Sequence, residues 1–325
     1  MRFLLVCIFL ISCSKSDDYS FKNYSSYEKS LDKDSIFKDN TNNFSFYDGL
    51  ASYNIQHNGL TRQYLLYIPP NVQSRTNLPV IFNFHGYSGQ ADQFFSSTNL
   101  IDIADSNGVV LVYPQGALLN GGDSHWNAAP MNSNSFLNKS DVDDIGFIMT
   151  LLDEVNQNNI LDLKRVYAIG YSNGGMFSHY LACNTDNVFA AIGDVAGTML
   201  LDTYNTCNPS SSVPVLKVHG TNDNVVSYNG YEEDGYKTVV DVVDFWKQNN
   251  NINNEYIFSS MSSSSWANYM GPVDFEKYTY GEEKNNSSVV LYKMLRGGHW
   301  WDYSMDDDLK TSSLLWEFFS KHSKD

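Results

Sequence analysis

The chain has 325 residues, with 37 acidic and 21 basic side chains and a formal net charge of −16. This acidity, without any cluster of Lys and Arg, excludes a protein that binds nucleic acid through its phosphates. A hydrophobic content of 42% at this length supports one large α/β domain with a sizeable core.

The first 13 residues, MRFLLVCIFLISC, have the composition of an export signal. Arg2 precedes an apolar run over residues 3–11, which is too short to span a bilayer because a spanning helix needs about 20 apolar residues. Residues 10–13 resemble the lipobox of bacterial lipoproteins, whose cysteine carries lipid. We therefore expect a signal peptide over residues 1–12, a lipid anchor at Cys13 that attaches the chain to a membrane, and export to the outer membrane or cell surface. An ordinary cleaved signal is the alternative.

Residues 13–47 are rich in Ser, Asp, Lys and Asn and show no sustained period, which predicts a flexible tether. Residues 48–325 contain neither internal repeats nor a sign of a second domain. They are expected to form a single catalytic domain.

Strand and helix patterns alternate through this domain. Short apolar runs predict strands, and the apolar spacing over 143–157 is that of a helix with one buried side. Buried strands separated by helices predict a mostly parallel sheet with helices on both faces. The predicted strands are 62–68, 79–84, 108–113, 165–169, 189–195 and 213–218, followed by a hairpin of 274–280 with 288–295. The predicted helices are 143–157, 173–182, 238–247 and 309–321.

Cys183 and Cys207 are an even pair in a chain expected to reach an oxidising compartment, which predicts a disulfide. It would close a loop of about 24 residues and contribute roughly 3 kcal/mol in the chain-entropy model. Two free buried thiols are the alternative.

Residues 170–174, GYSNG, fit the pattern G-x-S-x-G between an apolar strand and a helix. In that context the small residues let the backbone pinch, so that the serine hydroxyl projects above the sheet. The following helix points its first amides and the positive end of its dipole at the serine. Ser172 is therefore the predicted nucleophile, and a structural turn is the alternative.

A serine needs a base to accept its proton. His299 is the candidate, because the glycines before it allow a loop that returns the imidazole over the sheet. His85 and His219 each precede a glycine at a strand end and are expected to shape turns. His179 lies in the helix after the serine and is expected to point away from it.

The base needs an acid that fixes its tautomer, and Asp223, after the strand 213–218, is the predicted acid. Asp194 also follows an apolar run and is the alternative. The oxyanion hole is expected from the backbone N–H groups of Asn173, next to the nucleophile, and Tyr87, in the loop after His85. A plain strand-to-helix turn is the alternative for that loop.

The segments HGYSGQ, VLVYPQG, DVDDIGF, GYSNGGM, HGTND and GGHWW occur in the order seen in secreted polyhydroxybutyrate-depolymerase-like and feruloyl-esterase-like α/β-hydrolases. The resemblance runs from about Leu60 to Trp301. It implies an α/β-hydrolase fold and a serine esterase that acts through an acyl-enzyme without a metal or organic cofactor. It transfers the triad to the Ser, Asp and His named above and matches the predicted disulfide.

Two departures from that family concern the pocket. Such proteins often have a longer glycine run and His-Thr-Trp where this chain has His299 followed by Trp300 and Trp301. Residues 249–271 are unusually polar and can reshape the pocket or form a lid.

Aromatic side chains suit a phenolic acid or the face of a sugar, so Trp126, Trp300 and Trp301, with Tyr87, are the expected walls of a cleft. The alternative is that the tryptophans pack the loops, and two adjacent ones cannot both face the same way in an extended chain. The sequence favours a feruloyl or acetyl ester of plant polysaccharide over a short hydroxyalkanoate polyester. A glycan-binding lipoprotein without catalytic activity and a peptidase stay open.

Overall fold

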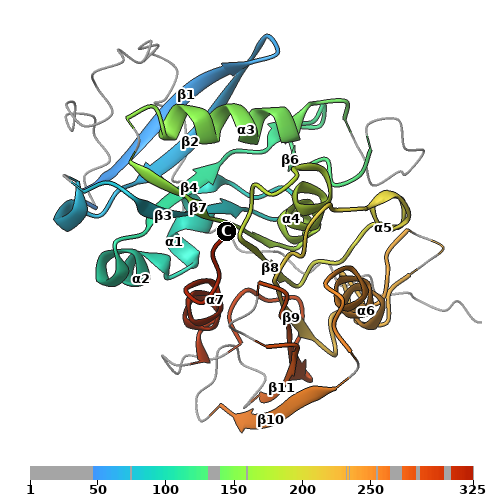
Figure 1. Cartoon of the computed structure of the whole chain (residues 1–325). Coiled ribbons are helices and arrows are strands. Elements are labelled where there is room, and N and C mark those ends of the chain that lie inside the picture. Colours follow the sequence, from blue (N-terminus) through green and yellow to red (C-terminus); the bar gives the residue numbers. More distant parts are fainter. Residues whose placement is uncertain are drawn as a thin grey trace, which may run out of the picture. The chain divides into compact units, whose positions relative to one another are not determined.

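Ten strands form one sheet in the described part of the chain, in the order β1-β2-β4-β3-β7-β8-β9-β12-β11-β10 (Figure 1). The computed structural model describes residues 47–324 except 74, 131–139, 159, 232, 234, 254, 264–272, 283–285 and 304–308. The predicted signal peptide, the lipidation site at Cys13 and nearly all of the predicted tether lie outside the described residues.

The six central strands, from β4 to β12 in sheet order, run parallel to one another, and the two strands at each edge pair in antiparallel fashion. The mostly parallel sheet predicted from the sequence is thus confirmed. Its strands are β1 Leu50–His57, β2 Leu60–Tyr67, β3 Leu78–Phe84, β4 Val110–Pro114, β7 Leu161–Tyr171, β8 Ala191–Val195, β9 Val215–Gly220, β10 Tyr256–Ser262, β11 Asp274–Tyr280 and β12 Val289–Leu295. A separate pair, β5 Ala117–Leu118 and β6 Ser124–His125, follows β4.

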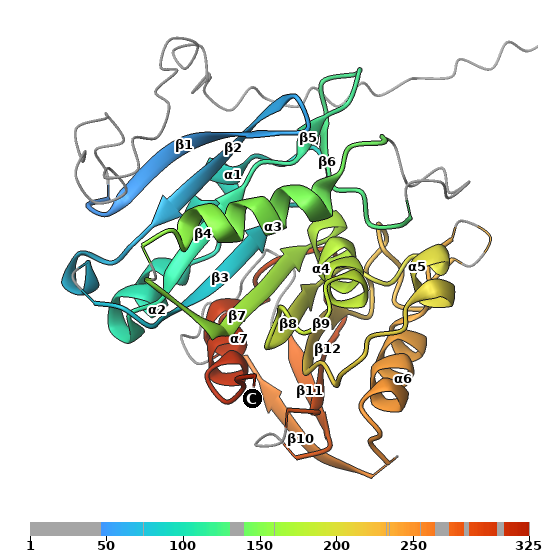
Figure 2. The same cartoon turned by 45° about the horizontal axis from the view of Figure 1, so that its top comes forward.

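Two layers of helices cover the sheet (Figures 1 and 2). Alternate side chains of a strand face opposite layers, so the core divides into two clusters: Phe82 and Phe84 of β3 belong to one cluster and Ile81 to the other. In the described chain, every helix is too short or too polar to cross a bilayer. One layer holds α3 Asp144–Val155, α4 Asn173–Asn184, α5 Leu201–Thr206 and α6 Val239–Asn249, and the other holds α1 Ala91–Ser97, α2 Leu100–Asn107 and α7 Thr311–Phe319.

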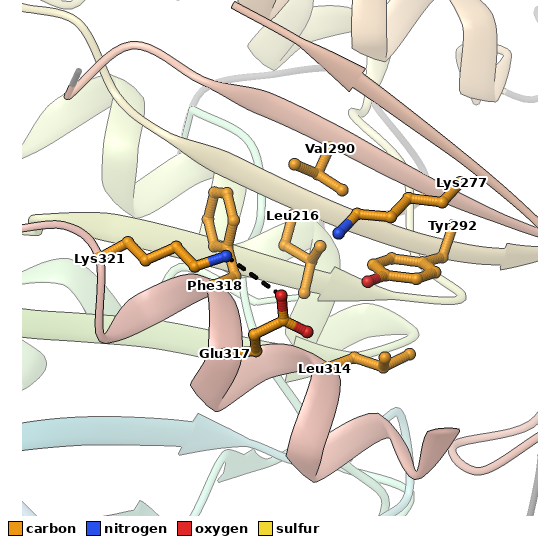
Figure 3. A pocket seen from close by; sticks show the side chains of 8 residues that line it. All are labelled: Leu216, Lys277, Val290, Tyr292, Leu314, Glu317, Phe318 and Lys321. Carbon is orange, nitrogen blue, oxygen red and sulfur yellow. Dashed lines mark hydrogen bonds and ion pairs between the residues drawn. The ribbon is translucent and has the colours of Figure 1, made fainter. Parts of the chain in front are cut away.

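A small cavity lies under α7, between that helix and strands β9, β11 and β12 (Figure 3). The Lys321 ammonium lies 3.1 Å from the Glu317 carboxylate at its wall. Leu216 of β9 points into this cavity, so its neighbour Lys217 points to the opposite face of the sheet, where α4 and α6 lie. The cavity is lined by Leu216, Lys277, Val290, Tyr292, Leu314, Glu317, Phe318 and Lys321, and none of the predicted site residues is among them.

Several elements were not predicted from the sequence: β1, α1, α2, α5, β10 and the short pair β5 and β6. Strand β10 falls within the polar stretch 249–271 that was considered as a lid. Residues 256–262 are instead the edge strand of the sheet, paired in antiparallel register with β11 from Tyr256↔Tyr280 to Ser262↔Asp274. Residues 264–272 lie outside the described residues.

The predicted disulfide is present between Cys183, in the last turn of α4, and Cys207, the residue after α5. It ties α5 to the helix that begins at Ser172. The prediction from the sequence is thereby confirmed.

Replacing both Cys183 and Cys207 by Ser should lower the free energy of unfolding by roughly 3 kcal/mol, because the unfolded chain regains a loop of 24 residues. Denaturant unfolding followed by tryptophan fluorescence measures the loss. The wild type in reducing buffer is the control and should lose a similar amount. Equal stability of wild type and double variant would contradict a stabilising role for the bridge.

Candidate active site

Ser172 stands at the bend between β7 and α4, as the N-cap of the helix. Its backbone angles, φ 54° and ψ −118°, lie in a sparsely populated region for a residue with a side chain. The bend persists because the Ser172 N–H donates to the carbonyl of Val195, at 2.9 Å, and its own carbonyl accepts from Met176. The predicted strand–serine–helix arrangement is what the structure contains.

The glycines of the motif are required by packing. A Cβ atom at Gly170 would overlap the backbone of Gly174, and one at Gly174 would overlap the carbonyl group of Phe84. Helix α4 therefore starts against the backbones of β7 and β3, which a larger residue at either glycine would prevent.

Asp223 and His299 meet at the same edge of the sheet. The Nδ1 of His299 lies 2.8 Å from Oδ2 of Asp223, while Oδ1 accepts the N–H groups of Val225 and Val226 at 2.9 and 2.8 Å. Burial by itself would raise the pKa of Asp223, but the hydrogen bonds from His299, Val225 and Val226 outweigh it, so the pKa lies below its ordinary value. An ionised Asp223 accepts the Nδ1 proton of His299 and leaves Nε2 to act as a base.

The loop that carries His299 is held against the end of β7. Tyr171, the residue before the serine, donates its hydroxyl to the carbonyl of His299 at 2.8 Å, and the two rings are 5.0 Å apart. Gly220 lies against the backbone of Gly297, where a Cβ atom would overlap it. The Ser172 hydroxyl makes no hydrogen bond within the described chain. This is compatible with catalysis because the hydrogen bond between a nucleophile and its base often forms fully only when substrate binds.

The loop after β3 passes beside the serine, since a Cβ atom at Gly86 would lie 3.4 Å from Cβ of Ser172. The Gly86 carbonyl accepts from Nδ1 of His85, at 2.7 Å, and from the N–H of Gly89, at 3.0 Å. In a trans peptide the next N–H points the opposite way, so these two bonds fix the direction of the Tyr87 N–H. Of the predicted donors, Asn173 follows Ser172 as the first residue of α4, and Tyr87 follows Gly86, the residue of this loop that lies beside Ser172.

His85 is neutral in this site. Burial is the main reason that its pKa is lowered to about 4, and the charge of Arg62 adds to the effect. Its Nε2 accepts the N–H of Gly116 at 2.9 Å, which leaves the proton on Nδ1 to be donated to Gly86. His85 therefore does more than shape a turn, because it orients the peptide that would serve the oxyanion.

Trp126 is not a wall of a cleft. Its side chain is fully buried, stacks on Phe177 with ring centroids 5.1 Å apart, and donates Nε1–H to the carbonyl of His85 at 3.1 Å. Its backbone N–H and carbonyl bind the side-chain amide of Asn173 at 2.8 and 2.9 Å. Trp126 thus belongs to the core and fastens the start of α4.

Trp301 is also placed in the core, where it packs edge-on against Phe94 of α1 at 5.1 Å. Trp300 is half-buried and packs beside Tyr303, with ring centroids 5.7 Å apart. Of the three predicted tryptophans, Trp300 alone keeps an exposed part with which it can touch a substrate.

Asp194, the alternative acid, does not contact His299. It is fully buried, and its carboxylate pairs with Lys217 at 2.8 Å and with His179 at 2.9 Å. Lys217 was not predicted as part of the site, although a lysine within the apolar run VLKVH is the signal that could have identified it. No set of three or more His, Cys, Asp or Glu residues in the described ranges is arranged to hold a metal ion.

Residues 62–230, just over half of the chain, match the protein family described as esterase PHB depolymerase. The chain belongs to this family. Feruloyl esterase B of Piromyces equi is 30% identical over 171 residues, which are 52% of this chain and 30% of that protein. The bifunctional acetylxylan esterase/xylanase XynS20E of Neocallimastix patriciarum is 30% identical over 174 residues, 54% of this chain and 23% of that protein.

This member of the family therefore spans less than a third of the length of either relative. Among solved structures, the acetyl xylan esterase from Aspergillus awamori has a TM-score of 0.59 with 12% sequence identity, covering 83% of this chain and 99% of that one. The likeness shows that the two share the α/β-hydrolase fold.

Replacing His85 by Phe should lower kcat by about 10-fold to 100-fold with little change in KM. Complete loss of one oxyanion donor costs up to roughly 10³-fold in kcat. The variant keeps the Tyr87 N–H and loses only the bond that fixes its direction, so the expected loss is smaller. Steady-state kinetics on p-nitrophenyl acetate measures the change. The matched variant is His85→Asn, whose amide can place an N–H near the position of Nδ1 and should retain more activity. Equal kcat in all three proteins would contradict the orienting role.

The stability should fall as pH falls from about 6.5 towards 4. His85 and His219 have pKa values lowered to about 4 and about 3, chiefly by burial, so the unfolded chain binds protons in this range before the folded chain does. Denaturant unfolding at several pH values measures the slope. His85→Asn, which removes one of the two groups, should show a shallower fall, and an unchanged slope would contradict the assignment.

Proposed function

We propose that this protein is a serine carboxylesterase, with Ser172 as nucleophile, His299 as general base and Asp223 as the acid that orients the base. The observation that carries the proposal is the hydrogen bond between buried Asp223 and His299 at the same sheet edge as the strained bend at Ser172. Membership of the esterase PHB depolymerase family supports it.

The reaction proceeds through an acyl-enzyme. Oγ of Ser172 attacks the ester carbonyl carbon as its proton passes to Nε2 of His299, and the imidazolium is stabilised by Asp223. The backbone N–H groups of Tyr87 and Asn173 bind the resulting oxyanion, each contributing about 3 kcal/mol. The C–O bond of the ester then breaks and the alcohol takes the proton from His299. Water attacks the acyl carbon by the same route, which releases the acid and restores the Ser172 hydroxyl.

The substrate we propose is a feruloyl or acetyl ester carried by plant polysaccharide. The names of the relatives, a feruloyl esterase and an acetylxylan esterase, support this class. Trp300 and Tyr87 remain the aromatic side chains that can contact such a group. A short hydroxyalkanoate polyester is the second candidate, favoured by the description of the family itself.

We further propose that the protein is exported and attached to a membrane by lipid at Cys13, on the strength of the lipobox-like residues 10–13. Partition of the full chain into a detergent phase tests the anchor. Cys13→Ala should move the protein into the aqueous phase, and partition unchanged by that variant would refute a lipid at Cys13.

A fluorophosphonate probe should label the wild type and fail to label Ser172→Ala, because the probe reacts with an activated serine. Ser178→Ala, a buried serine on the same helix, is the matched control and should label like the wild type. Turnover is then compared on methyl ferulate, acetylated xylan, hydroxybutyrate oligomers and a peptide anilide. We expect ester cleavage with negligible anilide cleavage, and Asp223→Asn should lower kcat by about 10⁴-fold.

An unlabelled wild type that still binds glycan would instead favour a binding protein on a hydrolase fold. Cleavage of the anilide at a rate like that of the esters would favour a peptidase. Preference for hydroxybutyrate oligomers over feruloyl and acetyl esters would select the second substrate class.

A further inference from the structure

A buried lysine lies beneath the proposed triad, on the face of the sheet covered by α4 and α6. The side chain of Lys217 is fully buried, and its ammonium has three acceptors. It donates to Oδ2 of Asp194 at 2.8 Å, to the carbonyl of Gly197 at 2.8 Å and to Nδ1 of His219 at 3.0 Å. Every N–H of the ammonium is thus satisfied without water.

Lys217 and the carbonyl of Val226 together decide which nitrogen of His219 carries the proton. An ammonium can only donate, so Nδ1 of His219 accepts and its proton must sit on Nε2. That Nε2–H donates to the carbonyl of Val226 at 2.8 Å and lies 3.4 Å from Oδ2 of Asp223. Burial, and next the charge of Lys217, lower the pKa of His219 to about 3, which agrees with a neutral ring.

His219 in turn fixes the turn that holds the acid. Val226 accepts from His219 through its carbonyl and donates its N–H to Oδ1 of Asp223 at 2.8 Å. The other carboxylate oxygen lies between Nδ1 of His299 and Nε2 of His219. The direction of the carboxylate towards His299 therefore depends on the hydrogen bond from Nε2–H of His219 to Val226, which holds the turn.

We propose that Lys217 and His219 are positioning residues for the esterase reaction, acting through the Nε2–H of His219 on Val226 to hold the turn that directs the Asp223 carboxylate at His299. The inference rests on the proposed function, in which Asp223 orients the base. It adds two residues to the machinery, one of which bears the charge that sets the tautomer of the other.

A purely structural role for this pair predicts a different result. A buried ion pair is weak evidence for stability, because an apolar pair of similar volume is often as stable. Structural packing would therefore change the free energy of unfolding and leave the pH dependence of kcat/KM unaltered. A positioning role changes both kcat and the pH dependence of kcat/KM.

The sign of the pH effect follows from the groups around the acid. Asp223 is faced by His219 from β9 and by His299. Tyr171 and Tyr303 are near enough to feel its charge, and burial keeps both tyrosines neutral by raising their pKa values. A misdirected Asp223 stabilises the imidazolium of His299 less. The base is then neutral at lower pH, so the acid limb of kcat/KM should move to lower pH. The titratable groups on the side of His219 away from Asp223 are Lys217, Asp194 and His179, and Tyr228 packs against the His219 ring.

The experiment compares His219→Leu with His219→Gln in the full chain. The amide nitrogen of Gln can reach the position of Nε2, whereas Leu cannot donate. We expect His219→Leu to lower kcat for p-nitrophenyl acetate by about 10-fold to 100-fold at similar KM and to move the acid limb to lower pH, because the hydrogen bond to the Val226 carbonyl that holds the Asp223 turn is lost. His219→Gln should recover most of the activity and the wild-type limb.

A second pair of variants covers the case in which His219→Leu does not fold. Asp194→Asn combined with Lys217→Met removes both buried charges together and takes away the donor to Nδ1 that holds the His219 ring, and it should reproduce the loss of kcat. Trp246→Phe is the matched control, since Trp246 donates to Nδ1 of His179 at 3.0 Å at the far end of the same buried chain. It should lower the melting temperature without moving the pH profile.

Activity of the wild type separates the two proposals. An active wild type whose network variants keep wild-type kcat and pH profile overturns the positioning role and leaves the esterase intact. A wild type that neither turns over esters nor labels at Ser172 overturns both. The downfield proton resonance of His299 Nδ1–H offers a readout without turnover: it should weaken or shift in His219→Leu and persist in Trp246→Phe, and an unchanged resonance in His219→Leu counts against the proposal.

Discussion

The bend at Ser172 requires α4 to begin in direct contact with the backbones of two neighbouring strands, and the rest of the site is arranged around that contact. Gly170 and Gly174 allow it, since a Cβ atom at either would overlap main-chain atoms. Gly175 extends the same contact towards Oδ1 of Asp194, where a Cβ atom would also overlap. The close approach that lifts the serine above the sheet thus brings a buried carboxylate under the helix, and that carboxylate is the counter-ion of Lys217.

The middle of the fold could be predicted from the sequence because the evidence for it is local. The apolar runs of the central strands and the small residues around Ser172 each fit within a few residues, and the predicted order Ser172, Asp223, His299 needs only that parallel strands end at one edge. Strand β1 was missed although Asn58-Gly59, both with positive φ, forms the tight turn of its hairpin with β2. The β10 residues were missed because nearly all of them are exposed, so no apolar alternation marks the strand.

What could not be predicted depends on contacts between distant segments. Trp126 looks like a loop residue in the sequence, and its burial comes from Phe177 on α4 and Phe84 on β3. The position of Lys217 fits a predicted strand, but the sequence does not show which groups its ammonium contacts. These are Asp194 on β8 and the carbonyl of Gly197 after that strand. A pattern in one segment cannot tell whether the opposite segment supplies a counter-ion or an apolar surface. The sequence therefore predicts only an ordinary strand residue at Lys217 and a turn residue at His219.

The two histidines that were expected only to shape turns have a shared design. His85 and His219 each end a parallel strand immediately before a glycine, each is fully buried and neutral, and each accepts a hydrogen bond on one nitrogen while donating from the other to a backbone carbonyl. One fixes the peptide next to the oxyanion position and the other fixes the turn that holds the acid. A neutral imidazole suits this task because it is both donor and acceptor, with the two functions on opposite sides of a rigid ring. In each case the partner that donates to the ring decides where the proton sits. The geometry of both halves of the site therefore depends on protons that burial keeps from titrating near neutral pH.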